Sequence, residues 1–205
     1  MAGIAQKILE HSASLPEGAV LSAKTLLHLG SRAGVDQALS RLARSGHLLR
    51  VGRGLYAPPV HSRFGTRAPQ PESVVEGIAA LTGETVAPSG AASANALGLS
   101  TQVPIRPVYL TSGPNRRLHL GRQVVELRHA PQWQLYAPKR PAGHALRALA
   151  WLGPQHASEA AEILRARLPH SERQALVSAR GQMPSWLAET VSRTFFQEAV
   201  EAASS

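Results

Sequence analysis

The chain has 205 residues, enough to bury a core as one large domain or as two small ones. It contains no cysteine, which excludes disulfide frameworks, thiolate metal sites and cysteine nucleophiles. Because it also lacks a run of 18 apolar residues and a secretory h-region, we expect a soluble cytoplasmic protein that does not enter a membrane. The formal charge of +9 indicates a polyanionic partner, most often nucleic acid.

The positive charge is concentrated near the N-terminus. Residues 1–67 hold nine lysines and arginines against three acids, whereas the remaining 138 residues hold 13 bases against 10 acids. No acidic residue falls between Asp36 and Glu72. Six arginines occupy that interval: Arg41, Arg44, Arg50, Arg53, Arg63 and Arg67. We therefore expect the polyanion to bind the N-terminal part of the chain.

Two helices are predicted before residue 31. The apolar residues of segment 4–9 have helical spacing, and this helix must end before Pro16. Ser22 is expected to cap a second helix. Gly30 would close that helix in the left-handed conformation that glycine adopts past helix ends.

A third helix is predicted from its cap at Ser31 to its end at Gly46. Its apolar residues follow the i, i+3, i+4, i+7 pattern of a helix with one buried face: Val35, Ala38, Leu39 and Leu42. The other face is polar and carries Arg32, Asp36, Gln37, Ser40, Arg41 and Arg44.

A two-stranded hairpin is predicted after the third helix. The segment "HLLRV" favours a strand, "GRG" a tight turn and "LYA" a second strand, which the prolines at 58 and 59 end. Three helices followed by a hairpin are the order of a winged helix-turn-helix, which we assign to residues 1–60. Residues 61–70 are rich in Pro, Gly and polar residues and are expected to be a linker.

Residues 71–205 are expected to form a second, α+β domain, with strands in 71–137 and helices in 141–201. A helix should end at Gly83, and another should run from near Ser89 to Gly98. Segments 103–113 and 116–130 have β character, and Gly121 is expected in a two-residue hairpin turn. The whole chain is thus predicted to be α+β, with a helical C-terminal part.

The winged-helix interpretation assigns roles to the basic residues. In this fold the second helix of the pair enters the major groove, so Arg32 could bind guanine and Gln37 adenine, while Arg41 and Arg44 would clamp phosphates. Arg53 lies between two glycines at the tip of the wing, where the backbone can approach a phosphate or a narrow minor groove. The full predicted DNA-binding set is Lys24, Thr25, Ser31, Arg32, Gln37, Ser40, Arg41, Arg44, Arg50 and Arg53.

A solvated charged face is the alternative interpretation of these arginines. The two interpretations differ in their salt dependence: if all six arginines of the acid-free interval met phosphates, log K against log salt would have a slope on the order of −5.

Catalytic and metal sites are not predicted. No two of the nine histidines lie three to five residues apart, and Glu126 and His129 would point to opposite faces of a strand. The segment "GAASANALG" lacks the Lys-Ser/Thr ending of a phosphate-binding loop, and its small residues favour close helix packing instead. We expect no cofactor.

Asn115, Arg116 and Arg117 are predicted to form an exposed basic turn. Such a turn could bind a phosphate or an acidic partner. It could equally be a solvated loop between two strands.

Three segments in succession resemble the AbiEi-type antitoxins of bacterial type IV toxin-antitoxin modules. They are "LLRVGRGLYAPP", "PSGAASANALGLSTQVP" and "VYLTSGPNRRLHLGRQVVELRHAP". The resemblance implies a recognition helix at Ser31–Arg44 and a wing at Arg50–Tyr56, which would bind operator DNA and repress the protein's own operon. It also implies a C-terminal domain that counters a nucleotidyltransferase-like toxin without a stable complex.

The resemblance identifies no antitoxic residue, and the assignment of that role to the Asn115–Arg117 turn is our own hypothesis. One winged helix buries only a modest surface against DNA, so we expect two copies of the protein on paired half-sites. The two copies could form a homodimer in solution or only on DNA.

Two other functions remain open. A stand-alone winged-helix transcriptional regulator without a toxin would have the same features. The C-terminal region could instead be a nucleic-acid-processing enzyme, although it shows no cluster of acids, histidines or Ser-Lys pairs of the kind that catalysis needs.

Overall fold

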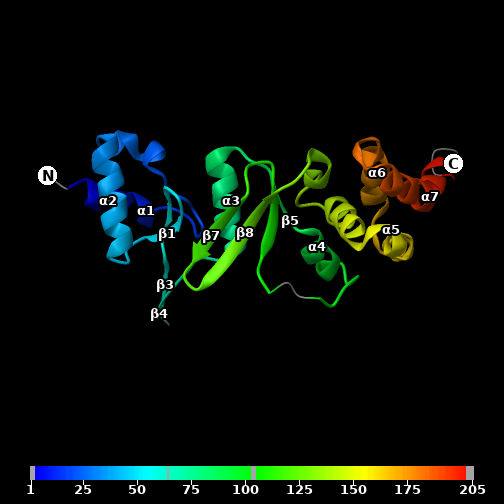
Figure 1. Ribbon diagram of the computed structural model, residues 1–205, viewed down its shortest axis with the longest axis horizontal. Coiled ribbons are helices and arrows are strands. Elements are labelled where there is room, and N and C mark those ends of the chain that lie inside the picture. Colours follow the sequence, from blue (N-terminus) through cyan, green and yellow to red (C-terminus); the bar gives the residue numbers. More distant parts are fainter. Residues whose placement is uncertain (1–2, 64, 103–104, 202–205) are drawn as a thin grey trace. The chain divides into compact units, whose positions relative to one another are not determined.

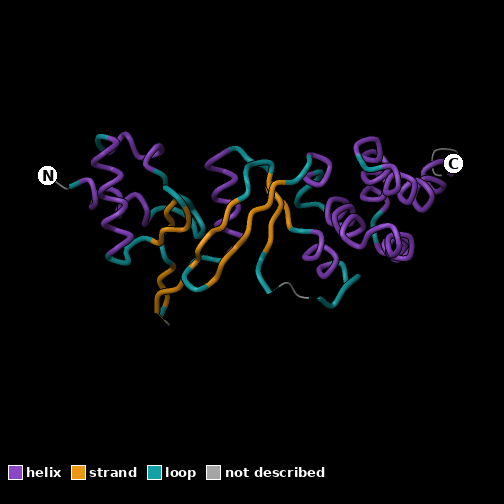
Figure 2. The backbone as a smooth tube through the Cα atoms, viewed as in Figure 1, coloured by secondary structure: helices purple, strands orange, loops and turns teal. Residues whose placement is uncertain are grey.

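The computed structural model describes residues 3–63, 65–102 and 105–201 and is α+β, with a helical C-terminal part (Figures 1 and 2). Contacts divide the chain into two compact units. Met1–Glu84 and Asn115–Leu127 form the first unit, and Thr85–Pro114 and Arg128–Ser205 form the second. The expected division into 1–60, a linker and 71–205 differs from this one, because residues 71–84 and 115–127 group with the N-terminal helices.

The first unit begins with α1 (Ile4–Ala13), the 3-10 helix η1 (Ala23–Leu29) and α2 (Arg32–Arg44). They share one core with the chain that follows them, whose buried members are Ile8, Leu21, Ala23, Leu26, Val35, Ala38, Leu39, Leu42, Leu48 and Tyr56. The four apolar positions predicted for α2 are all buried, and the Ser31 hydroxyl caps the helix by accepting from the backbone N–H of Gly34 at 3.2 Å.

Gly30 differs from the prediction. Its φ of 165° is extended rather than left-handed, and the helix before it is a 3-10 helix. A Cβ at this position would lie 2.6 Å from Cδ1 of Ile4, so the Ile4 side chain packs closely against this glycine. The chain therefore passes in an extended conformation from η1 into the cap of α2.

Two antiparallel hairpins follow α2. Strands β1 (Leu49–Gly52) and β2 (Leu55–Ala57) pair with Arg50 opposite Tyr56, and Gly54 in the turn has the positive φ of 69° that this tight connection needs. Strands β3 (Val60–Ser62) and β4 (Gly65–Arg67) form the second hairpin. The range 61–70, predicted as a linker, thus includes most of these two strands, while Phe64 within it lies outside the described residues.

Helix α3 (Pro71–Thr82) belongs to the first unit because its backbone closely approaches the segment after α1. A Cβ on Gly77 would lie 2.2 Å from the carbonyl oxygen of Gly18. Gly18 itself has a φ of 84°, and a Cβ there would collide with Ser73. The two glycines together let α3 lie against the N-terminal chain. As predicted, α3 ends at Gly83, whose φ is 74°.

The first unit also contains a long hairpin. Strand β7 (Arg116–Leu120) pairs antiparallel with β8 (Gln123–His129), and Leu120 faces Gln123 across the predicted two-residue turn. Gly121 in that turn has a φ of 63°. The last two residues of β8 belong to the second unit.

The second unit joins a small strand pair to a helical bundle. Strand β5 (Val86–Pro88) pairs antiparallel with β6 (Val108–Thr111), and α4 (Gly90–Ala96) begins at the predicted cap Ser89. The start of the predicted β stretch, Val103 and Pro104, lies outside the described residues. The helices that follow are η2 (Gln132–Leu135), α5 (Pro141–Arg167), α6 (His170–Ala179), η3 (Arg180–Gln182) and α7 (Ser185–Glu201).

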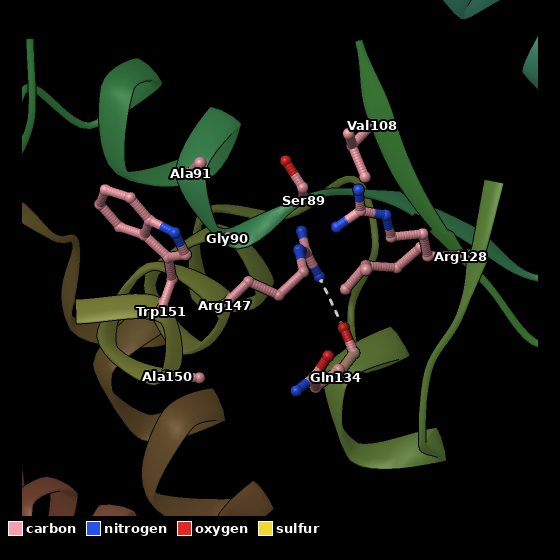
Figure 3. Close-up of a pocket in the computed structure, with 10 residues that line it drawn as sticks. Ser89, Gly90, Ala91, Val108, Arg128, Gln134, Arg147, Ala150 and Trp151 are labelled. Atoms are coloured by element: carbon pink, nitrogen blue, oxygen red, sulfur yellow. Dashed lines mark hydrogen bonds between the residues drawn. The ribbon is translucent and has the colours of Figure 1, made fainter. Parts of the chain in front are cut away.

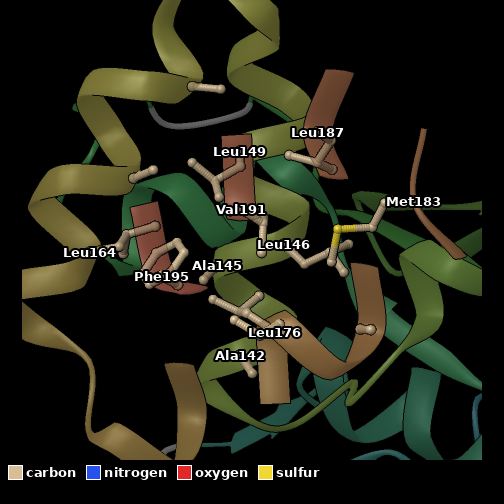
Figure 4. Packing of buried hydrophobic residues seen from close by; sticks show 14 of the residues in the cluster. Ala142, Ala145, Leu146, Leu149, Leu164, Leu176, Met183, Leu187, Val191 and Phe195 are labelled. Atoms are coloured by element: carbon tan, nitrogen blue, oxygen red, sulfur yellow. The ribbon is translucent and has the colours of Figure 1, made fainter. Parts of the chain in front are cut away.

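The core of the second unit lies among α5, α6 and α7 (Figure 4). It contains Leu146, Leu149, Leu176, Leu187 and Phe195. Helix α5 is interrupted at Gly153, which has a φ of 74° and is followed by Pro154, so its two helical segments meet at a sharp break. Within the described chain, no helix is both long enough and apolar enough to cross a membrane.

Candidate nucleic-acid interface

The outward face of α2 carries a polar stripe. Gln37, Arg41 and Arg44 lie at positions i, i+4 and i+7, which place them above one another on a helix, and all three are exposed. The Gln37 amide and the Arg41 guanidinium make no hydrogen bond within the described part of the chain, while Arg44 Nε donates to the carbonyl of Ser40 at 3.4 Å. These side chains are available to a ligand.

The side chains of Ser31 and Arg32 at the start of α2 already have hydrogen-bond partners. Arg32 Nε donates to Asp36 Oδ2 at 2.8 Å, and both side chains are more than half exposed. Surface pairs of this kind contribute little to stability, so Arg32 can exchange the carboxylate for another acceptor. The Ser31 hydroxyl serves as the helix cap.

The candidates in η1 differ from each other. Lys24 is exposed. The Thr25 hydroxyl donates to the Ser22 carbonyl at 3.0 Å and lies 3.4 Å from the Ser22 amide nitrogen, which completes the cap of η1. Thr25 therefore has a local structural role, and only Lys24 presents an unengaged charge.

The β1–β2 hairpin presents two arginines. Arg50 and Arg53 are exposed, whereas Val51 and Tyr56 are buried. Arg53 lies at the tip of the hairpin beside Gly54. A Cβ on Gly54 would meet nothing within 4 Å, so only its backbone conformation requires glycine.

Arg67 does not belong with the other arginines of the acid-free interval. Its Nη1 and Nη2 donate to the two carboxylate oxygens of Glu17 at 2.9 and 3.1 Å, and the backbone N–H of Gln70 donates to the same carboxylate at 2.9 Å. The hydrogen bond from Arg67, followed by that from Gln70, lowers the pKa of Glu17. An acid from outside the interval thus neutralises one of its six arginines.

Residues Asn115–Arg117 do not form the predicted basic turn. Arg116 and Arg117 are the first residues of β7 rather than part of a turn, and only Asn115 precedes the strand. Arg116 is largely buried and ion-paired with Glu84, and Arg117 Nε lies 3.8 Å from Glu126 Oε1. The local sequence shows three polar residues in a row. It does not show that Glu84, just after α3, and Glu126, in β8, lie beside the two arginines.

The sequence interpretation missed Arg147, which lies in α5 within the apolar run "HALRALAWL". Its side chain is 1% exposed, and it lines a pocket of the second unit (Figure 3). A cation inside an apolar helical run was the signal that could have identified it. Among the described residues, no group of three His, Asp or Glu side chains is arranged to hold a metal ion.

Comparison with known proteins places this two-unit α+β chain in a family. The chain belongs to DUF6088, a family of unknown function whose model matches residues 7–174. A comparison with curated proteins finds no match. Among solved structures, the crystal structure of the RV2827C protein from Mycobacterium tuberculosis is similar, with a TM-score of 0.54 and 16% sequence identity over 94% of this chain and 76% of that chain. At this identity the similarity is one of fold alone.

Proposed function

We propose that this protein binds operator DNA through a winged helix-turn-helix formed by its first 60 residues, with α2 as the recognition helix and the β1–β2 hairpin as the wing. The observation that carries the proposal is the set of exposed arginines on these two adjacent elements. Arg41, Arg44, Arg50 and Arg53 have no acidic partner within the described part of the chain. Four such cations suit the phosphates of DNA.

The division of labour follows from side-chain chemistry. Gln37 offers the donor and acceptor pair that adenine requires in the major groove, and Arg32 offers a bidentate donor for guanine once it leaves Asp36. Arg53 at the hairpin tip, like Arg41 and Arg44 farther along α2, suits phosphate oxygens. We propose that Lys24 adds a further backbone contact.

We further propose that the DNA-binding activity belongs to a cytoplasmic antitoxin that represses its own operon and counters a nucleotidyltransferase-like toxin. This step rests on the resemblance of three sequence segments to AbiEi-type antitoxins. The pairing of Arg116 with Glu84 argues against its direct contact with a toxin, whereas Asn115 and Arg117 are exposed and keep the antitoxic role in our proposal.

Two experiments test the proposal in separate parts. DNA from upstream of the gene, compared with a scrambled duplex of equal length in a gel shift, tests operator binding: equal affinity for both would contradict it. Co-expression with the product of a neighbouring nucleotidyltransferase gene tests antitoxicity: growth arrest despite the intact protein would contradict that part. Sequence-specific binding without protection would favour a stand-alone regulator instead.

A further inference from the structure

The pocket beside Arg147 in the second unit has a buried cation in its wall. It has a volume of about 280 Å³, and its lining residues come from β6, β8, η2 and α5 and from α4 with its cap. The polar groups in its wall are those of Arg147, Arg128, Gln134 and Ser89. In Figure 3 the guanidinium group of Arg147 lies below Ser89, and that of Arg128 lies beside it.

Arg147 is a buried cation held by carbonyl groups. Its Nη1 donates to the carbonyls of Gln134 and Tyr136 at 3.3 and 3.2 Å, and its Nη2 donates to the carbonyl of Pro138 at 3.0 Å. These bonds use three of the five N–H groups of a guanidinium. Its Nε, also buried, has no partner within the described chain. The carbonyl groups provide hydrogen bonds but no negative charge.

Arg147 remains positively charged at neutral pH. Burial lowers the pKa of Arg147 to about 10, which still leaves the guanidinium protonated, and burial, followed by the charge of Arg147, lowers the pKa of the neighbouring His144. A buried cation normally has an anionic partner, because its desolvation is otherwise uncompensated. Within the described residues Arg147 forms no ion pair with an acidic side chain.

The rest of the pocket suits a phosphate group. The Ser89 hydroxyl accepts from the Ala92 N–H at 3.3 Å, which leaves its own proton to donate. Trp151 lies at the edge of the pocket with its side chain 42% exposed, and such an aromatic face can stack on a nucleobase. The volume falls just below the range of about 300–1,000 Å³ typical of pockets for drug-sized ligands, so the ligand must be small.

We propose that this pocket binds a small phosphate-bearing ligand, with Arg147 and Arg128 compensating its charge and Ser89 donating to it. The ligand is either free phosphate or the phosphate of a mononucleotide. This site lies in the second unit and is independent of the DNA interface proposed above. The carbonyl bonds of Arg147 also tie the segment 134–138 to α5, but that structural role gives no reason for the open space beside its guanidinium.

Calorimetric titration of the full-length protein tests the site with inorganic phosphate, adenosine 5′-monophosphate and adenosine. We expect both phosphate probes to bind and adenosine to bind at least about tenfold more weakly than its monophosphate, because it lacks the charge. Equal affinity for the two phosphate probes would identify free phosphate as the ligand, and tighter binding of the monophosphate would identify a nucleotide. Equal binding of adenosine and its monophosphate would overturn the proposal, as would no binding of either phosphate probe at about 10 mM.

Three variants separate ligand binding from folding. Arg128→Gln removes a pocket charge, and Ala91→Leu fills the pocket while keeping every bond of Arg147; each should weaken phosphate binding at least about tenfold. Arg193→Gln, which removes an exposed charge on α7 away from the pocket lining, is the matched control and should change binding less than about twofold. Circular dichroism verifies that each variant is folded. Unchanged affinity in both pocket variants would overturn the proposal.

Discussion

Gln37 and Arg53 occupy different kinds of position on the proposed DNA interface. Gln37 is an exposed amide on the outer face of α2, whereas Arg53 is an exposed cation at the tip of a hairpin. An amide can distinguish bases, but a cation at a phosphate attracts every DNA sequence alike.

Their substitutions should therefore have different effects. We expect Gln37→Ala to weaken binding to the operator by about 1–3 kcal/mol and to leave binding to scrambled DNA unchanged. Arg53→Ala should weaken binding to both duplexes to a similar extent. Gel shifts with the two duplexes measure this, and identical effects of the two substitutions would show that α2 does not read bases.

Glu172 gives a prediction about pH. Its Oε1 accepts from Arg140 Nη2 at 2.8 Å and its Oε2 from the backbone N–H of Ala142 at 2.9 Å, and the Arg140 bond followed by the Ala142 bond lowers the pKa of Glu172. A carboxyl group with a lowered pKa in the folded state stabilises the protein above its unfolded pKa. That stabilisation is lost as the pH falls through the folded pKa.

Glu172→Gln should accordingly lower the melting temperature at pH 7, and the difference from the wild type should shrink toward pH 3. Thermal unfolding followed by circular dichroism across this range provides the measurement. Glu162→Gln is the control, since Glu162 pairs with Arg165 only at the exposed surface and its loss should matter little. A difference that stays constant with pH would contradict the role of the Glu172 charge.

For individual side chains, the sequence predicts exposure to solvent better than it predicts interaction partners. The alternation of apolar and polar positions along α2 was enough to place Gln37, Arg41 and Arg44 on the outer face. It could not reveal that Glu17 neutralises Arg67, because the two residues are 50 positions apart and only the tertiary fold joins them. The buried Arg147 was missed for a similar reason, since its carbonyl partners lie in the segment before its helix.

Helix α4 illustrates an element that local sequence specifies well. The serine cap at Ser89 and the small residues after it predicted both a helix and its close packing, and the structure confirms both. A Cβ on Gly90 would lie 2.4 Å from the Cβ of Trp151 and 2.6 Å from the carbonyl oxygen of Arg147. The glycine thus sets how closely α4 approaches α5.

Gly90→Ala should force these two helices apart. We expect it to destabilise the protein by about 1–3 kcal/mol, as overpacked sites do, and to lower the melting temperature by at least about 2–4 °C. Gly181→Ala provides the control, because a Cβ there would meet nothing within 4 Å. Equal stability of the two variants would contradict the close packing of α4 on α5.

The second hairpin and the position of α3 illustrate the opposite case. The segment that forms β3 and β4 is so rich in polar residues, Pro and Gly that its composition favoured a linker, yet its backbone pairs with itself. The approach of α3 to Gly18 depends on two missing side chains far apart in the sequence. Such contacts leave no periodic pattern, so the boundaries of the units could not be predicted.

The fold leaves fewer arginines available to DNA than the sequence alone indicates. With Arg67 neutralised, four arginines without acidic partners remain on α2 and the β1–β2 hairpin. If each displaces one phosphate counterion, log K against log salt should have a slope of about −3.5, shallower than the value for six arginines.

Salt titrations of DNA binding by fluorescence anisotropy measure this slope. Arg53→Gln should make it shallower by about 1, because one phosphate contact is lost. Arg193→Gln, on the second unit, should leave it unchanged even though the net charge falls equally. The same reduction in both variants would mean that net charge, rather than the proposed interface, governs binding.

The path of the chain between its two units has a consequence for the gene. The polypeptide passes from one unit to the other after Glu84, after Pro114 and again after Leu127. Neither unit is therefore encoded by one uninterrupted stretch of DNA, and no single recombination point can exchange one unit and leave the other whole. A truncation after Glu84 would leave the first unit without its long hairpin, one after Pro114 would remove part of both units, and one after Leu127 would leave the second unit incomplete.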